Sequence, residues 1–309
     1  MVNMQFSLSR RSAAAGLGAA ALLALAGCGG GGAVSSAGGP TLSNLVATTV
    51  QYGRTMTVSA SGSGLSEGVV LDAGGACTNV TAVANGTDTQ QSFTCRVSQL
   101  GSMTVRVRLA SGGRELGSLR LDVPAPQVSI RVTQAAQDGP PSIAARSGTF
   151  VVELDPVAAP RTVNNFLDYV NSGFYANTIF QRVVRDFVAE AGGYATTNNN
   201  NKFIKPPTGA ASPSEADNGL KNVRYSLAMA RGADANSATS VFFVNLADNP
   251  SLDFGSVENP AGFTVFGRVV SGQEVIDILN TVDTRPNLAL ELPNLPVTNV
   301  VIAAATQTR

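Results

Sequence analysis

A lone arginine lies in an apolar stretch of the chain, and a glutamate follows it closely. The segment FQRVVRDFVAEAGGY, residues 180–194, contains Arg182 and, eight residues further on, Glu190. The 309-residue chain contains no histidine. The commonest acid–base residue, the catalytic triads that depend on it and most zinc sites are therefore excluded. Chemistry at this place has to use a fixed cation and its apolar surroundings.

The composition indicates folded domains and argues against several classes of protein. Apolar residues make up 44% and charged residues 14% of the chain, whose length suits two domains of about 100–200 residues each. The formal net charge is zero, whereas nucleic-acid binders normally carry a basic balance or a basic stripe. The cysteines form no cluster with metal-ligand spacing. We therefore expect no bound metal and no nucleic-acid partner.

The chain begins with the features of an export signal. Arg10 and Arg11 are followed by the apolar run AAAGLGAAALLALAG and then by Cys28. This stretch is similar to a bacterial lipobox, in which the cysteine carries a lipid and becomes the first residue of the mature chain. An ordinary signal peptide or a short membrane anchor is the alternative, but the run is short and rich in Ala and Gly for a membrane span.

The lipobox predicts where the protein resides. Residues 1–27 would be a lipoprotein signal peptide, and residues 28–40, rich in Gly and Ser, a flexible tether. The protein would lie in the bacterial cell envelope, facing the periplasm and held at a membrane only by its lipid. Gly29 stands where inner-membrane retention commonly needs an aspartate. This favours the outer membrane over the inner membrane.

Residues 41–125 are predicted to form a small β-sandwich of immunoglobulin type. The segment consists of short, partly alternating runs separated by Gly, Ser and Asn turns, without a helical period. Cys77 and Cys95 lie within it, and an even pair outside the cytoplasm predicts a disulfide. Two buried free thiols are the alternative. We find no catalytic constellation here and favour a spacer or adhesion-type module.

The second half of the chain has a different pattern. After the linker VPAPQ, residues 123–127, a helix is predicted from Pro160 to Gly173, because apolar residues recur at helical spacing: Val163, Phe166, Leu167 and Val170. A second helix, in SGQEVIDILNTV, is predicted to bury Val275, Ile276, Leu279 and Val282. Two helices and about eight strands predict a β-barrel with helices at its open ends.

Several long segments occur in the order found in one enzyme family. They are VVELDPVAAPRTVNNFLDYVNSGFYANTIFQRVV, EADNGLKN, LAMAR, NSATSVFFVNLADNPSLD and FTVFGRVVSGQEVIDIL. Through them, residues 128–306 resemble the cyclophilins, the peptidyl-prolyl cis-trans isomerases. The resemblance implies a closed eight-stranded antiparallel β-barrel capped by two helices, in a chain that is mainly β. It also implies proline-containing polypeptides as substrates, no cofactor and a monomeric protein.

Rotation about an X–Pro peptide bond needs no acid or base. Resonance in the C–N bond sets a barrier of about 18–20 kcal/mol, and overcoming it moves no proton. An apolar pocket favours the less polar twisted amide, and a fixed cationic donor favours it further. The resemblance implies that Arg182 is this donor, with Phe187 and Glu190 as its catalytic neighbours. An arginine in a surface or structural ion pair is the alternative.

The resemblance also assigns a proline pocket. The positions that match its lining or its backbone contacts are Val188, Ala230, Val241, Phe243, Leu252 and Phe263. For each of them, barrel core is the competing interpretation. Phe242 should point to the opposite face from Phe243, by strand alternation, and belong to the core.

Several positions depart from the family pattern, among them Gln181, where the family usually has His, and Arg185-Asp186, where it usually has a Pro-Gly turn. The family usually has Gln at Glu190 and at Val241, Met at Val188, and Trp or Phe at Ser251. A carboxylate at Glu190 would pair with Arg182 in one of two ways. The pair would either hold the guanidinium in a productive pose or occupy its donors and reduce the positive charge that the twisted amide needs.

Three functions follow from these observations. The first is an envelope-anchored prolyl isomerase that assists the folding of exported proteins. The second is a proline-peptide binding or scaffold module that kept the barrel and lost most of its turnover, which the altered pocket positions favour. In the third, the β-sandwich carries the biological role, such as binding the cell wall or a partner protein.

Overall fold

We analysed the protein as a computed structural model. The structure describes residues 39–48, 50–136, 142, 144–197 and 203–309. The predicted signal peptide, Cys28 and nearly all of the tether lie outside these residues. The chain divides into two compact units, one containing Thr55–Arg96 and Thr104–Leu121, the other Asp122–Arg309. Among the described residues, no helix has the length and apolar character that a membrane span requires.

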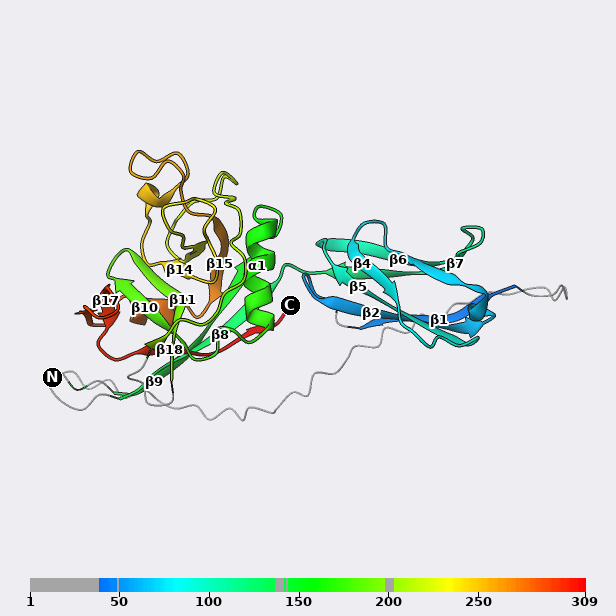
Figure 1. Cartoon of the computed structure of the whole chain (residues 1–309), viewed down its shortest axis with the longest axis horizontal. Helices are drawn as coiled ribbons and strands as arrows, with labels where there is room; N and C mark the ends of the chain where they lie inside the picture. The colour runs from blue at the N-terminus through cyan, green and yellow to red at the C-terminus, as the bar shows by residue number, and fades with distance from the viewer. Residues whose placement is uncertain (1–38, 49, 137–141, 143, 198–202) are drawn as a thin grey trace. The chain divides into compact units, whose positions relative to one another are not determined.

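The first unit is built from two antiparallel sheets, which confirms the predicted β-sandwich (Figure 1). One sheet has the order β1-β2-β5-β4 and the other β3-β6-β7. Alternate residues of the strands are buried, as in the run from Met56 through Val58 to Ala60. The strands are β1 (Thr41–Thr48), β2 (Thr55–Ser63), β3 (Val69–Asp72), β4 (Cys77–Ala82), β5 (Gln90–Val97), β6 (Gly101–Leu109) and β7 (Glu115–Val123), with a 3-10 turn, η1 (Leu65–Glu67).

The predicted disulfide between Cys77 and Cys95 is present. It joins β4 to β5, which are neighbours in the same sheet. The disulfide of an antibody domain instead connects the two sheets. Since it closes a loop of 18 residues, the bond stabilises this unit by about 3 kcal/mol in the chain-entropy account.

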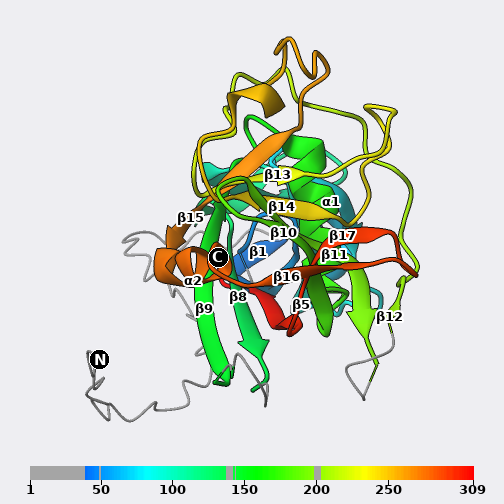
Figure 2. The same cartoon turned by 90° about the vertical axis from the view of Figure 1, so that its left-hand side faces the viewer.

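The second unit is a closed barrel (Figure 2). Eight strands pair in the order β10-β18-β8-β9-β15-β13-β14-β11, and β11 pairs back with β10. Every pair is antiparallel, so the predicted eight-stranded antiparallel β-barrel is confirmed. Its strands are β8 (Gln127–Gln134), β9 (Arg146–Leu154), β10 (Thr178–Val184), β11 (Val188–Thr196), β13 (Ser226–Met229), β14 (Phe242–Asn245), β15 (Val265–Ser271) and β18 (Val300–Gln307).

Short elements extend the barrel without belonging to its ring. The strand β12 (Phe203–Ile204) pairs with the end of β11. A hairpin of β16 (Thr284–Asn287) and β17 (Leu292–Pro296) lies between the last helix and β18. A 3-10 turn, η2 (Pro250–Leu252), follows β14.

Two helices accompany the barrel, as predicted. The helix α1 (Pro160–Asn171) buries the expected apolar face, and the ring of Phe166 contacts those of Tyr175, Phe242 and Phe266. Phe242 is thus a core residue, as strand alternation predicted. Gly173, at a φ of 75°, follows the end of α1 in the left-handed region that glycine adopts without strain.

The second helix is shorter than predicted. The helix α2 (Gln273–Leu279) buries Val275, Ile276 and Leu279 as expected. Val282 lies beyond the end of the helix and is only partly buried, so its predicted place on the buried face is wrong. The helical spacing continues in the sequence for a turn that the backbone does not form.

A distant glutamate caps the start of α1. The residue before the helix is Ala159, whose methyl side chain cannot accept a hydrogen bond from the free N–H groups of the first turn. The Glu215 carboxylate accepts hydrogen bonds from the N–H groups of Arg161 (3.0 Å) and Thr162 (2.8 Å) and from the Thr162 hydroxyl (2.8 Å). The N–H of Glu215 donates to Thr264 Oγ1 (3.0 Å). Glu215 therefore ties the segment before β13 to both α1 and the start of β15.

We expect Glu215→Ala to lower the free energy of unfolding by about 1–3 kcal/mol, because it leaves the first N–H groups of α1 without an anionic partner. Urea unfolding followed by far-ultraviolet circular dichroism would measure the loss. Glu258→Ala is the control, since Glu258 is exposed and forms no ion pair within the described part of the chain. Its effect should stay within about 0.5 kcal/mol. Equal losses in both variants would contradict the capping role.

Candidate active site

The barrel brings Arg182 and Glu190 together on adjacent strands. They are direct partners in the register of β10 and β11. Arg182 Nη1 lies 2.5 Å from Glu190 Oε1, and the two side chains are 29% and 24% exposed. The ion pair that the sequence suggested is therefore present, and both side chains still reach solvent.

The guanidinium of Arg182 retains free donors. Its central carbon lies 5.8 Å from the ring centre of Phe187, so the cation is near the face of an aromatic residue. Among the described residues, Nη1 is the one guanidinium nitrogen of Arg182 that forms a hydrogen bond. Because a guanidinium carries five N–H donors, Nε and Nη2 remain able to bind a carbonyl oxygen or an amide nitrogen.

An apolar cluster lies beside this pair. Its buried members are Val188, Ala228, Phe243 and Val265, contributed by β11, β13, β14 and β15. Partly buried apolar residues pack against them: Phe187, Leu220, Ala230, Leu252 and Phe263. Glu190 is the cross-strand partner of Phe243, so the ion pair and the cluster share the same part of the sheet.

The structure gathers nearly all of the residues that were predicted for the proline pocket. Val188, Ala230, Phe243, Leu252 and Phe263 all belong to the cluster, with Phe187 beside them. Val241 lies next to it rather than in it: its carbonyl accepts the Ala230 N–H at 2.9 Å, and its side chain is partly buried near Gly193. The catalytic and binding roles of these residues remain predictions.

Three members of the cluster were not predicted. Ala228 and Val265 lie two residues from Ala230 and Phe263 along their chain segments. Since alternate residues of a strand share a face, the two-residue period would have found both. Leu220 lies in a connection between strands, where no period applies.

A second arginine supports the far side of the cluster. The guanidinium carbon of Arg231 lies 4.7 Å from the ring centre of Phe263. Its Nη2 donates to Asn259 Oδ1 (2.8 Å) and to the Gly262 carbonyl (2.9 Å). Phe263 also meets Phe243 edge to face, with ring centres 5.5 Å apart. These contacts fix one aromatic wall.

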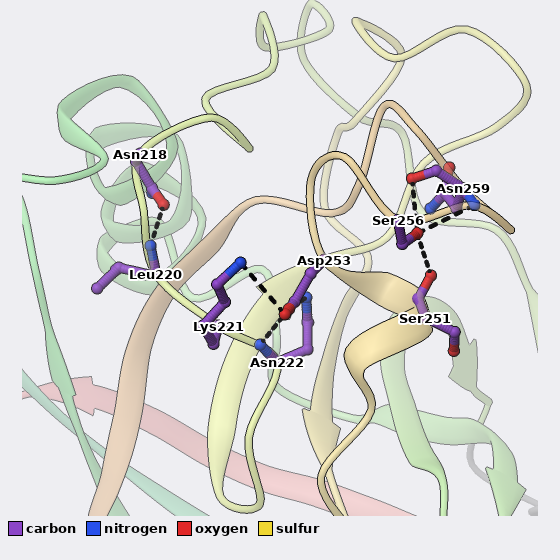
Figure 3. A network of polar contacts seen from close by, with 8 residues as sticks. All are labelled: Asn218, Leu220, Lys221, Asn222, Ser251, Asp253, Ser256 and Asn259. Carbon is purple, nitrogen blue, oxygen red and sulfur yellow. Dashed lines mark hydrogen bonds and ion pairs between the residues drawn. The ribbon is translucent and has the colours of Figure 1, made fainter.

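The loop after η2 is hydrogen-bonded internally beside Ser251, where the family usually has Trp or Phe. Ser251 lies in η2, and its carbonyl accepts a hydrogen bond of 2.8 Å from Ser256 Oγ (Figure 3). The N–H of Asn259 donates to the same Ser256 hydroxyl at 3.1 Å. The loop after η2 is thus bonded internally next to the small Ser251 side chain.

Comparisons with known proteins agree with one another. Residues 142–307 match the family described as cyclophilin type peptidyl-prolyl cis-trans isomerase/CLD. Peptidyl-prolyl cis-trans isomerase A of Dickeya dadantii is 43% identical over 159 residues, 52% of this chain and 79% of that protein. A peptidyl-prolyl cis-trans isomerase of Streptomyces antibioticus is 42% identical over 160 residues, 52% of this chain and 92% of that protein.

A solved structure is also similar. It is a crystal structure of a cyclophilin-type peptidyl-prolyl cis-trans isomerase of Cryptosporidium parvum, 22% identical, with a TM-score of 0.41. The similarity covers 58% of this chain and 99% of that one.

We expect the ion pair to contribute little to folding. Arg182→Met should change the free energy of unfolding by less than about 1 kcal/mol, because a partly exposed pair is screened by solvent. Phe243→Ala should cost about 3–5 kcal/mol, because it leaves a cavity in a buried cluster. Chemical unfolding of both variants measures the difference. A loss of several kcal/mol in Arg182→Met would instead assign the arginine a structural role.

Proposed function

Since the chain belongs to the cyclophilin-type peptidyl-prolyl cis-trans isomerases, we propose that it accelerates X–Pro rotation in exported polypeptides, with Arg182 as the catalytic donor. The observation that carries the proposal is the position of Arg182. Its guanidinium lies at the border of an apolar cluster, with two nitrogens free of hydrogen bonds from the described residues. A proline ring would occupy the cluster while its amide meets these donors.

The chemistry needs only this arrangement. The cluster formed around Phe243 offers the prolyl ring an apolar surface and disfavours the polar planar amide relative to the twisted one. As the bond twists, the prolyl nitrogen recovers its lone pair, and the free donors of Arg182 stabilise it there. An acceleration of a thousandfold to a millionfold requires about 4–8 kcal/mol of transition-state stabilisation. A fixed charge at the edge of an apolar pocket has this capacity, and no proton has to move.

Glu190 has two opposite effects on Arg182. By binding Nη1, it limits the motion of a long side chain and keeps the guanidinium beside Phe187. Its negative charge also lowers the positive potential at the pocket. Since both side chains are about a quarter exposed, water screens the charge, and the free donors keep part of their strength.

The cellular setting of the proposal rests on the N-terminal sequence. Arg10, Arg11, the apolar run and Cys28 support an exported lipoprotein, anchored in the bacterial envelope and facing the periplasm. The disulfide between Cys77 and Cys95 is consistent with an oxidising compartment. Proline-containing polypeptides passing through the envelope would be the substrates of a monomeric enzyme.

A scaffold that binds proline peptides with little turnover is the second candidate. It is favoured by the occupied Nη1 of Arg182 and by Val241, which supplies no amide to hold a peptide backbone. The two candidates differ in the rate of rotation and not in peptide binding.

The full chain should accelerate cis–trans exchange of a short Ala-Pro peptide, measured by NMR exchange spectroscopy. Arg182→Ala should lose most of the acceleration. Arg268→Ala is the matched control, because it removes an exposed arginine that pairs with Glu153 at 3.4 Å. It should leave the exchange rate unchanged. Peptide shifts that report binding without faster exchange in the parent would favour the scaffold.

We expect Glu190→Gln to raise the exchange rate by up to about tenfold. The change removes a negative charge next to the guanidinium, whose interaction is worth about 1 kcal/mol in water and about 4 kcal/mol near a protein surface, and it keeps a side chain that accepts a hydrogen bond. Peptide exchange in the parent and the variant, at equal saturation with peptide, measures the effect. A slower variant would show that the carboxylate is needed to hold Arg182 in its pose.

A further inference from the structure

The partly buried residues around the apolar cluster lie in connections and not in strands, and we call three of them, Phe187, Leu220 and Leu252, the walls of the cluster. Leu220 precedes β13, Leu252 lies in η2, and Phe187 lies in the turn between β10 and β11. A strand is held by its ladder of hydrogen bonds, but these connections have no ladder. Other bonds must therefore set the distance between the three walls.

A chain of asparagine side chains runs behind these walls. Asn249 Nδ2 donates to the Phe187 carbonyl (2.8 Å) and to Asn245 Oδ1 (2.7 Å). Asn245 Nδ2 donates in turn to Asn222 Oδ1 (3.2 Å). The side chain of Asn222 then donates to Asp253 Oδ1 (3.1 Å). All three asparagines and Asp253 are buried.

The chain of donors ends at a buried carboxylate. Asp253 Oδ1 also accepts the N–H of Asn222 (2.8 Å), and Lys221 Nζ lies 3.5 Å from Oδ2 (Figure 3). From Asn249 to Asp253 each amide donates toward the negative charge, whereas Asn249 also donates in the opposite direction, to the Phe187 carbonyl. Asn245 Nδ2 additionally donates to Ser226 Oγ (2.9 Å). Aligned hydrogen bonds polarise one another, and a bond to an ionised acceptor is the strongest kind. Each of the three asparagine side chains is therefore held by at least two hydrogen bonds.

Residues of this hydrogen-bonded series adjoin each of the three walls, either in the sequence or through a hydrogen bond. Leu220 is followed directly by Lys221 and Asn222, and Leu252 is followed directly by Asp253. Phe187 is held by its own carbonyl, which accepts from Asn249 and from the Leu246 N–H at 2.8 Å. The three walls thus share one hydrogen-bonded support.

We propose that Asn249, Asn245, Asn222 and Asp253 are positioning residues, which set the spacing of Phe187, Leu220 and Leu252 for catalysis. The inference rests on the proposed isomerase function. The four residues touch no substrate and act through the pocket walls. Since a displacement of about 1 Å at a reacting group is enough to cost up to a hundredfold in rate, a loosened support would slow rotation strongly.

The test is a double-mutant cycle between Asn249 and Phe187. Asn249→Ala removes the side chain that bonds the Phe187 carbonyl, and Phe187→Leu removes the ring that this bond places. Peptide exchange rate and peptide affinity are measured by NMR for the parent, both single variants and the double variant. If Asn249→Ala does not fold, Asn249→Ser replaces it, because its hydroxyl still donates one hydrogen bond.

The expected result is coupling. Asn249→Ala should slow exchange roughly 10- to 100-fold in the parent, and less than about threefold in Phe187→Leu, where the ring is already absent. Asn171→Ala is the matched control: its amide donates to Gln307 Oε1 at 3.0 Å, at the end of α1. It should lower stability and leave exchange unchanged.

Two outcomes would overturn the inference: an equal slowing by Asn249→Ala in both backgrounds, or no slowing at all. Failure of the proposed function is a separate result, in which the parent binds the peptide but does not speed its exchange. The same cycle in peptide affinity then decides the inference, because a displaced Phe187 wall weakens binding as well. Coupling in affinity would support it, and its absence would contradict it.

Discussion

The proposed catalysis requires a permanent charge that lies against an apolar surface without being buried and without being fully neutralised. Arg182 meets this condition because β10 and β11 place it opposite Glu190 on the barrel wall, about a quarter exposed, while β14 places Phe243 on the other side of Glu190. A deeper guanidinium would cost several kcal/mol of desolvation, and a fully exposed one would be screened by water. A partly exposed position on the barrel wall avoids both costs.

Strands and connections contribute different parts of the apolar cluster. Four strands supply the buried members of the apolar cluster, from Val188 to Val265, and closure of the barrel fixes their spacing. The connections supply the walls, where side-chain hydrogen bonds replace the missing ladder. Asp253 and Glu215 are the two carboxylates on which these bonds converge: the first supports the walls, and the second ties the segment before β13 to α1. Asp253 thus orders backbone outside the strands, and Glu215 holds the first turn of a helix.

Sequence reasoning succeeded where a short-range pattern carries the information. The face of α1 followed from its helical period, and the barrel followed from the order of the family segments. It failed where tertiary partners decide: β4, with a single buried residue, shows no alternation, and Glu215 caps a helix more than 50 residues away. The asparagine chain is equally hidden, since nothing in the sequence indicates which amide an asparagine will meet. The predicted pocket positions came from the resemblance. It omitted Ala228 and Val265, which lie two residues from predicted positions, and Leu220, which lies in a connection between strands.

In the proposed mechanism, Arg182 acts as a fixed charge, and Glu190 holds it in place and transfers no proton. The most direct test is the rate of catalysed cis–trans exchange of an Ala-Pro peptide in H2O and in D2O. The full chain is saturated with peptide, and the pH and pD are equal. Rotation by electrostatic stabilisation breaks no bond to hydrogen, so the two rates should be nearly equal. A clearly slower exchange in D2O would show that a proton moves in the rate-limiting step. Catalysis by a fixed charge alone would then be contradicted.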